Sequence, residues 1–503
     1  MIELFVAALV AIQEPVVLET KEADPLVFAI THDGSKGDAL TGRVYVSLTR
    51  GAIPPLSGPS LYNPEPFFGV DVHQWKAGDV LLIDEFADAT KGSPGDIGEG
   101  PWKAVAIYRS LNNSSRLVSK GGLYSKPVII TQSPSDVGTV PISLDLAVPD
   151  REWKEHKNLR LVHMKSELLS SELGREISHG ACVIVPDDYN PNREEPYPVT
   201  YWIGGYGSDH YGGRYMKALF TGSDYDDQIC RVILNSQCYN GHHLFVDSQN
   251  NGSRLTAFVN EFLPALEKTY NIGKSPDMRA LAGHSDGGFA ALWLLIQKPE
   301  MFRGSWSLVP TPVHFKHFYT CDIYQDQANM YIDEAGVERP ISRNGLTPNV
   351  WIRGLTQQSD VVKNGGILSM YDWAFSPKGE DGNAQSLYDH ETGAVNKEVA
   401  EAWEAFDILK VLQSNWETLK PKLEGKINIV AAEYDTFYLE DSVIALKQFF
   451  DEHQFDAHVY IKPDVNHGGV FNTLLIREMD EWFANTLNLE NHQAKPMGPQ
   501  PAS

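Results

Sequence analysis

A serine, a carboxylate and a histidine stand where they could form a nucleophilic catalytic set. Ser285 lies in the pattern Gly-x-Ser-x-Gly, which reads Gly-His-Ser-Asp-Gly over residues 283–287. Asp435 and His467 follow it in the chain, within Glu-Tyr-Asp and Asn-His-Gly. A serine hydroxyl becomes a good nucleophile when a histidine accepts its proton, and a third group must orient that histidine. These residues therefore predict covalent catalysis by Ser285, with His467 as the base and Asp435 as the acid.

Two other carboxylates could take the role of the acid. Glu433 and Asp441 lie near Asp435 after the same predicted strand and are its rivals. His467 follows the last predicted strand of the chain, which is where the base of such a set lies.

The other histidines do not predict a metal site or a cofactor. His314 and His317 are three residues apart, and His242 and His243 are adjacent, but no carboxylate or cysteine set completes a metal site by spacing. We expect His284, inside the serine motif, to be a packing or hydrogen-bonding neighbour and not a second base.

The residues around Ser285 predict a sharp turn between a strand and a helix. Residues 277–282 are typical of a short strand, and residues 288–296 of a buried helix. The glycines of the motif permit the turn, because a Cβ there would collide with a neighbouring strand or helix. A serine at such a corner presents its hydroxyl at the carboxyl end of a sheet.

An oxyanion hole needs two backbone N–H groups that point at the developing negative charge. We expect one from Asp286, the residue after the serine. The second should come from the loop after the apolar run 198–203, where Gly-Gly-Tyr-Gly occupies residues 204–207. Tyr206 is the best match in that loop.

From about residue 157 onward, predicted strands alternate with predicted helices. The strands are 159–164, 177–185, 198–203, 230–235, 277–282, 304–309, 426–432 and 457–461, and the helices are 255–270, 288–296, 442–453 and 474–486. This order is typical of a mostly parallel sheet covered by helices on both faces, an α/β fold. We assign residues 157–490 to this domain.

Residues 24–156 differ in character from the rest. Short β-rich runs at 26–30, 42–48, 102–108, 127–131 and 142–148 alternate with clusters of Pro, Gly, Asp and Ser. The pattern predicts an all-β sandwich. It would serve as a scaffold, or as a surface for a carbohydrate or a protein partner.

Three further segments complete the predicted organisation. Residues 310–425 exceed what a single strand-helix connection needs and are rich in Trp and Tyr, so we expect an inserted cap over the carboxyl edge of the sheet. Residues 1–23 could hold a weak export signal or a first strand, and the polar tail 491–503 is expected to be disordered.

Composition excludes several classes of partner. The formal charge of −24 argues against nucleic acid or an anionic membrane surface, since both attract a basic face. No apolar run reaches the ~18 residues of a membrane-spanning helix. The four cysteines are too few for a disulfide scaffold, although Cys230 and Cys238 could pair in an oxidising compartment. The weak export signal, the acidic charge and the added β domain favour a secreted or periplasmic protein without excluding the cytoplasm.

The motifs together resemble one family. Residues 157–488 resemble the putative-esterase family of α/β-hydrolases, which includes esterase D, feruloyl and acetyl-xylan esterases, enterochelin esterases and mycolyltransferases. The matching pieces are residues 201–207, 283–288, 433–435 and 466–468. The resemblance implies a serine hydrolase of carboxylic esters with Ser285, Asp435 and His467 as its triad. Gly204 stands where many members have histidine, and the insertion is not a general family feature.

Several functions are consistent with this resemblance. The leading hypothesis is hydrolysis of a small-molecule or carbohydrate-linked ester through an acyl-enzyme. Acyl transfer of the mycolyltransferase type is an alternative, as is a glycan-binding protein with an auxiliary esterase domain. A serine peptidase on the same fold is a further alternative.

Overall fold

The computed structural model describes residues 16–17, 25–51, 56, 58–62, 64–112, 114–221, 223 and 225–489. The chain forms two compact units, each assembled from separate segments. The first unit comprises residues 1–152, 238–241 and 353–370, and the second comprises residues 153–237, 242–352 and 371–503. The leader and tail predicted at 1–23 and 491–503 fall outside the described residues, except for the backbone of residues 16–17.

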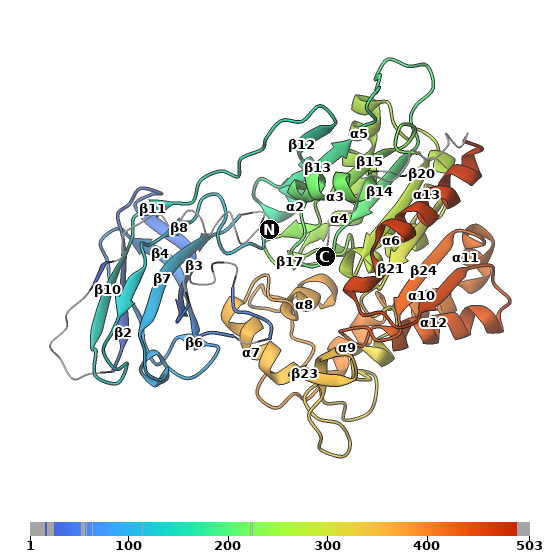
Figure 1. The fold of residues 1–503 in the computed structure, drawn as a ribbon. Helices are drawn as coiled ribbons and strands as arrows, with labels where there is room; N and C mark the ends of the chain where they lie inside the picture. Colours follow the sequence, from blue (N-terminus) through green and yellow to red (C-terminus); the bar gives the residue numbers. More distant parts are fainter. Residues whose placement is uncertain are drawn as a thin grey trace. The chain divides into compact units, whose positions relative to one another are not determined.

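The second unit is built on a mixed sheet of eight strands, coloured from green to red in Figure 1. The spatial order is β12-β13-β15-β14-β20-β21-β24-β25, antiparallel at β12–β13 and β13–β15 and parallel elsewhere. The strands are β12 (Leu159–Lys165), β13 (Ser178–Ile184), β14 (Val199–Ile203), β15 (Cys230–Leu234), β20 (Arg279–His284), β21 (Gly304–Leu308), β24 (Ile427–Ala432) and β25 (His458–Lys462). The sequence predicted each of these strands to within about two residues at either end. Strands β14, β15, β21 and β24 are buried at every residue, as expected for strands covered on both faces.

Helices cover both faces of this sheet. On one face, α3 (Gly213–Phe220) and α13 (Thr473–Leu487) share a hydrophobic cluster with Trp202, Ala282 and Trp306. On the other face, the ring of Tyr201 packs edge-on against Phe258. Phe258 begins a π-helical segment (Phe258–Phe262) that joins α4 (Arg254–Ala257) to α5 (Leu263–Tyr270). The other helices of this unit outside the insertion are α2 (Glu167–Leu173), α6 (Asp286–Gln297) and α12 (Glu440–Glu452), with short 3-10 turns at His210–Gly212, Pro276–Met278, Phe315–His317 and Gly468–Val470.

This arrangement is an α/β-hydrolase fold. The chain also contains short strands that the sequence did not predict, namely β16 (Gln237–Cys238), β17 (Gly241–His242), β18 (Asp247–Ser248) and β19 (Gly252–Ser253).

The first unit contains two sheets that enclose one hydrophobic cluster. The larger has the order β1-β9-β7-β3-β4-β6 with β8 and β11 at its side, and the smaller has the order β10-β2-β5. Phe28 and Ile142 of the smaller sheet meet Val46 and Ala104 of the larger in this cluster. The strands are β1 (Val16–Val17), β2 (Val27–His32), β3 (Ala39–Thr49), β4 (Phe67–Lys76), β5 (Leu81–Ile83), β6 (Asp88–Ala89), β7 (Trp102–Ser110), β8 (Leu123–Tyr124), β9 (Val128–Ile130), β10 (Thr139–Leu144) and β11 (Leu146–Ala147), with a 3-10 turn at Pro94–Asp96.

The opposite face of the larger sheet holds a segment from far along the chain. Residues 353–370 belong to the first unit. Arg43 is buried, and its Nε donates to the Val361 carbonyl over 3.0 Å, while the Tyr45 hydroxyl donates to the Val362 carbonyl over 2.9 Å. Arg109 donates to the Asn364 carbonyl. The segment predicted as one insertion, 310–425, is therefore divided between the two units.

The insertion contains helices and a β-hairpin that the sequence did not predict. It forms a hairpin of β22 (Pro340–Asn344) and β23 (Thr347–Trp351), followed by the helices α7 (Ile352–Val362), α8 (Ser369–Phe375), α9 (Lys397–Trp403), α10 (Ile408–Ser414) and α11 (Trp416–Leu423). Within the described residues, no helix combines the length and apolar character needed to cross a membrane. All four cysteines are buried and none forms a disulfide, so Cys230 and Cys238 are not paired with each other.

Candidate active site

Ser285 lies at the turn between β20 and α6, as its sequence predicted. Its φ of 60° and ψ of −123° are strained for a residue with a side chain. The turn is held by the Ser285 N–H, which donates to the Leu308 carbonyl over 2.9 Å, and by the Ser285 carbonyl, which accepts from Phe289 over 3.1 Å. At Gly287 an added Cβ would overlap the Ile203 carbonyl, so only glycine fits there.

His467 and Asp435 form a buried pair near this turn. The Nδ1 atom of His467 lies 2.8 Å from Oδ2 of Asp435, and both residues are buried. The second carboxylate oxygen of Asp435 accepts the Phe437 N–H over 2.8 Å. A carboxylate fixed in this way can hold an Nδ1–H tautomer of the imidazole and leave Nε2 as a proton acceptor.

Glu433, the nearest rival for the role of the acid, is engaged elsewhere. Its carboxylate accepts the Asp464 N–H over 2.9 Å. Asp441 lies in the first turn of α12. The structure therefore brings Asp435 to the histidine, while Glu433 supports the loop that leads to it.

His284 contacts the same histidine from the serine turn. Its Nε2 lies 3.3 Å from the His467 carbonyl oxygen, and its ring packs edge-on against the His467 ring at 4.9 Å between centroids. Burial lowers the pKa of His284 to about 4, so this imidazole is neutral at ordinary pH. It acts as the hydrogen-bonding neighbour that the sequence suggested.

Asp286 and Tyr206, the two predicted oxyanion donors, lie together. Asp286 is the first residue of α6, so its N–H has no partner inside the helix. The Tyr206 backbone N–H donates to the carboxyl group of Asp286. The second predicted donor is thus held by the side chain of the first, which the sequence did not suggest.

The Asp286 carboxyl is buried beside the serine. Its Oδ1 accepts the Tyr371 hydroxyl over 2.9 Å, and that hydroxyl lies 3.0 Å from the hydroxyl of Tyr319. Burial raises the pKa of Asp286 to about 6, although the hydrogen bonds and the nearby His467 oppose the increase. Both tyrosines come from the insertion, which therefore reaches the residue after Ser285.

His242 supports the loop of residues 204–207, for which the sequence predicted an oxyanion donor (the oxyanion loop), and the sequence did not single it out for this contact. Its Nδ1 accepts the Leu244 N–H over 3.0 Å, which leaves the proton on Nε2. That Nε2 lies 3.0 Å from the Gly204 carbonyl and can donate to it. Burial lowers the pKa of His242 to about 4, so the neutral form persists. The only sequence signal was a histidine pair without ligand partners.

The remaining histidines flagged by spacing have structural partners. His314 lies 3.1 Å from the buried Asp407, which also caps α10. Among the residues that the structure describes, no group of three or more His, Cys, Asp or Glu side chains is placed to hold a metal ion.

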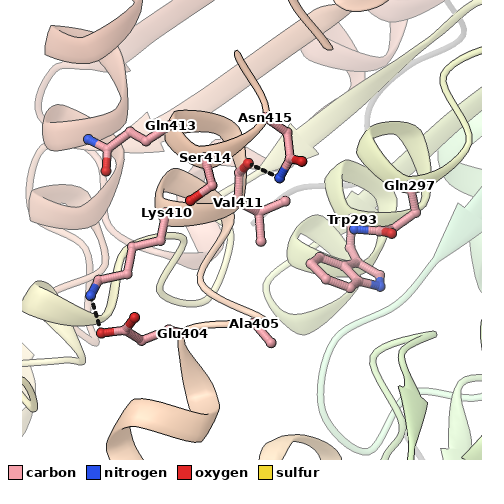
Figure 2. Close-up of a pocket in the computed structure, with 9 residues that line it drawn as sticks. All are labelled: Trp293, Gln297, Glu404, Ala405, Lys410, Val411, Gln413, Ser414 and Asn415. Atoms are coloured by element: carbon pink, nitrogen blue, oxygen red, sulfur yellow. Dashed lines mark hydrogen bonds and ion pairs between the residues drawn. The ribbon is translucent and has the colours of Figure 1, made fainter. Parts of the chain in front are cut away.

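One pocket of the second unit is separate from these residues. It has a volume of about 680 Å³ and is lined by Trp293, Gln297, Glu404, Ala405, Lys410, Val411, Gln413, Ser414 and Asn415. Figure 2 shows the Glu404–Lys410 ion pair at one side and Trp293 at the other. None of the predicted site residues lines this pocket, so the pocket does not indicate where the catalytic residues lie.

Comparison with known proteins finds that the central part of the chain is similar to a family. Residues 170–404 match the family model described as "Putative esterase". The match includes Tyr206, Ser285 and Asp286, and it ends before Asp435 and His467. No curated protein sequence matches the chain.

Solved structures show distant likeness. A fluorophosphonate-binding serine hydrolase of Staphylococcus aureus is 11% identical, with a TM-score of 0.40, over 65% of this chain and 99% of its own. An S-formylglutathione hydrolase of Agrobacterium tumefaciens is 13% identical, with a TM-score of 0.41, over 65% and 95%. A ferulic acid esterase is 15% identical, with a TM-score of 0.38, over 65% and 99%.

Because these TM-scores are below 0.5, the family assignment rests on the family match. That match confirms the resemblance predicted from the motifs. Residues 170–404 are similar to the putative esterase family, and the chain is a carboxylesterase-type hydrolase.

Proposed function

We propose that the chain hydrolyses carboxylic esters through an acyl-enzyme on Ser285, with His467 as general base and Asp435 as the acid that orients it. The observation that carries the proposal is the 2.8 Å contact between His467 Nδ1 and Asp435 Oδ2, made by two loops that follow neighbouring strands. The strained φ of Ser285 supports its role as the nucleophile.

The proposed reaction has two stages. The Ser285 oxygen attacks the ester carbonyl carbon while its proton passes to Nε2 of His467, and the tetrahedral intermediate then expels the alcohol, which takes that proton. A water molecule next attacks the acyl-serine, again giving its proton to His467, and the released Ser285 oxygen recovers it. Asp435 stabilises the imidazolium that forms in each stage.

The oxyanion of each intermediate would be stabilised by the N–H groups of Asp286 and Tyr206. Since the Tyr206 N–H donates to the Asp286 carboxyl in the free protein, it must be shared with the substrate oxygen or turned toward it on binding.

We also propose that the β-rich residues 24–156 form a sandwich that acts as a scaffold, and that the insertion 310–425 acts as a cap. The scaffold role is supported by Arg43, Tyr45 and Arg109, whose donors are used to hold the main chain of residues 361–364. Side chains committed in this way are not available to bind a glycan.

The direct test is labelling with a fluorophosphonate, followed by intact mass measurement, on wild type and Ser285→Ala. We expect one adduct on wild type and none on the variant, with loss of several orders of magnitude in hydrolysis of aryl esters, acetylated sugars and feruloyl esters. Equal turnover by both proteins would refute the proposal. If only wild type is labelled and active, the relative rates on the panel of esters would define the acyl and alcohol parts of the substrate.

A further inference from the structure

The loop that carries Asp435 is in contact with the hairpin of the insertion. Strands β22 and β23 pair in antiparallel register around a tight turn at Gly345, where φ is +59°. At the end of β22, the Arg343 N–H donates to the Thr436 carbonyl over 2.9 Å. Since Thr436 is the residue after Asp435, the hairpin binds the main chain of the loop that carries Asp435.

The side chain of Arg343 extends this contact to both sides of the loop. Its Nε donates to the Asp435 carbonyl over 2.8 Å, and its Nη2 forms an ion pair with Glu440 at the start of α12. Its guanidinium lies 4.4 Å from the ring centroid of Tyr438, a loop residue with a φ of +58°. One side chain thus joins the beginning, the middle and the end of the segment from Asp435 to Glu440.

These contacts are mostly shielded from water. The side chains of Arg343 and Glu440 are each 11% exposed. Oε2 of Glu440 is buried and has no hydrogen-bond partner among the described residues, and burial raises the pKa of this carboxyl to about 7. Water therefore has limited access to replace the guanidinium, and its removal would leave the Asp435 carbonyl without that donor.

We propose that Arg343 is a positioning residue for Asp435, so that the insertion completes the catalytic triad and is not only a cover over the site. This inference rests on the proposed function, in which Asp435 orients His467. A carboxylate must be held within a fraction of an ångström to keep an imidazole in a productive orientation. The Phe437 N–H alone fixes one oxygen of Asp435, whereas Arg343 fixes the loop that carries it.

The test compares Arg343→Ala and Arg343→Lys with wild type in hydrolysis of 4-nitrophenyl acetate. We expect kcat to fall about 10- to 100-fold in Arg343→Ala, with KM changed less than about twofold, because the acid is misplaced while the substrate site remains. Arg343→Lys should recover little, since an ammonium group cannot reproduce the fork of donors. Added guanidinium ion should restore part of the activity of Arg343→Ala only.

Arg339→Ala is the matched control. Arg339 also belongs to the insertion, but it donates to the carbonyls of Thr320, Asn329 and Ile332, which are within the insertion itself. Its loss should lower stability without lowering the kcat of the folded fraction. Equal kcat losses in Arg339→Ala and Arg343→Ala, with no rescue by guanidinium, would overturn the positioning role.

A double variant separates positioning from an unpaired charge. If Arg343→Ala is slow only because Glu440 is left uncompensated beside Asp435, then Arg343→Ala/Glu440→Gln should recover wild-type kcat, and the proposal is wrong. If the guanidinium positions the loop, the double variant should stay slow.

A readout independent of turnover distinguishes this inference from the proposed function. The His467 Nδ1 proton should give a downfield proton resonance in wild type, and this resonance should shift or broaden in Arg343→Ala but persist in Arg339→Ala. If Ser285→Ala matches wild type in turnover, the proposed function fails, yet the resonance still decides whether Arg343 holds Asp435 against His467. An unchanged resonance in Arg343→Ala would refute the inference by itself.

Discussion

The Tyr371 hydroxyl donates to Oδ1 of Asp286 over 2.9 Å, which joins the insertion to the residue that follows the nucleophile. The carboxyl is fully enclosed by protein, since Asp286 is only 2% exposed. A carboxylate in such a place is stabilised by hydrogen bonds but loses its hydration, and here the loss of hydration dominates.

Replacement of Asp286 by Asn should change how stability depends on pH. Burial raises the pKa of Asp286 from 3.8 to about 6, so the native state holds its proton more tightly than the unfolded chain does. The resulting stabilisation is fully present below pH 3.8 and is lost as pH rises through about 6. The stability of wild type relative to Asp286→Asn should therefore fall by about 2 kcal/mol between pH 4 and pH 7.

Urea unfolding of both proteins across this pH range measures the effect. The informative quantity is how the difference in unfolding free energy between wild type and Asp286→Asn changes with pH. The amide also alters hydrogen bonds, but it does so by an amount that does not depend on pH. A difference that is constant from pH 4 to pH 7 would show that the Asp286 carboxyl titrates as in the unfolded chain.

Asp435→Asn should abolish most activity while the fold remains intact. An amide cannot stabilise the imidazolium of His467, and its NH2 group can force the wrong tautomer. We expect kcat to fall about 10³- to 10⁴-fold, by analogy with other Ser-His-Asp sets. Steady-state kinetics and circular dichroism check the two parts of this prediction.

Glu433→Gln provides the matched control for Asp435→Asn. It removes the charge of the rival carboxylate two residues away but keeps an oxygen to accept the Asp464 N–H. Its kcat should stay within about threefold of wild type, since an exposed hydrogen bond contributes little. If the two variants lost activity equally, the assignment of the acid would be wrong.

Much of the second unit was predictable because its signals are local. Strands buried on both faces are mostly apolar runs in the sequence. The turn at Ser285 is indicated by a glycine pattern between such a run and an apolar helix. Strand β4 (Phe67–Lys76) was missed although its residues partly alternate, since it follows a Pro-rich stretch and contains Gly69. That glycine is explained by tertiary structure, because a Cβ there would lie 2.7 Å from the Arg43 guanidinium.

The supports of the site were not predictable for a different reason. Arg343 and His242 act on main-chain carbonyls that are 92 and 38 residues away in sequence. A carbonyl leaves no residue-type signal, so a single sequence gives no means of pairing such groups. The short helices of the insertion did carry local signals, since Asn396 and Asp407 cap α9 and α10.

His242→Ala should weaken the oxyanion loop. The variant leaves the Gly204 carbonyl and the Leu244 N–H unpaired in a buried place, which should cost about 1–3 kcal/mol of stability. A loop with less support should also stabilise the oxyanion less well, so we expect kcat to fall about tenfold. Thermal unfolding and kinetics on the same preparation measure both effects.

His243→Ala tests whether the loss is specific to the loop. His243 is also buried, and its Nδ1 accepts the Phe245 N–H over 3.2 Å, away from residues 204–207. This variant should lose stability to a similar degree and keep its kcat. A similar loss of kcat in both would indicate a general disturbance of the segment and not a role in the oxyanion loop.

Arg43→Met should destabilise the first unit through the segment that its larger sheet holds. The buried guanidinium donates to the Val361 carbonyl and pairs with Asp71 and Asp88, whose carboxylates are half exposed. Because water can reach the two carboxylates but the carbonyl is left without its donor, we expect a loss of about 2 kcal/mol. Lys363→Met is the control, since it removes a pair with the same Asp71 in which both partners are half exposed, and should cost less than about 1 kcal/mol. Denaturant unfolding measures the free energy of unfolding of both variants. An equal loss of stability in both would mean that the surface ion pairs, and not the buried hydrogen bond to the Val361 carbonyl, stabilise this segment.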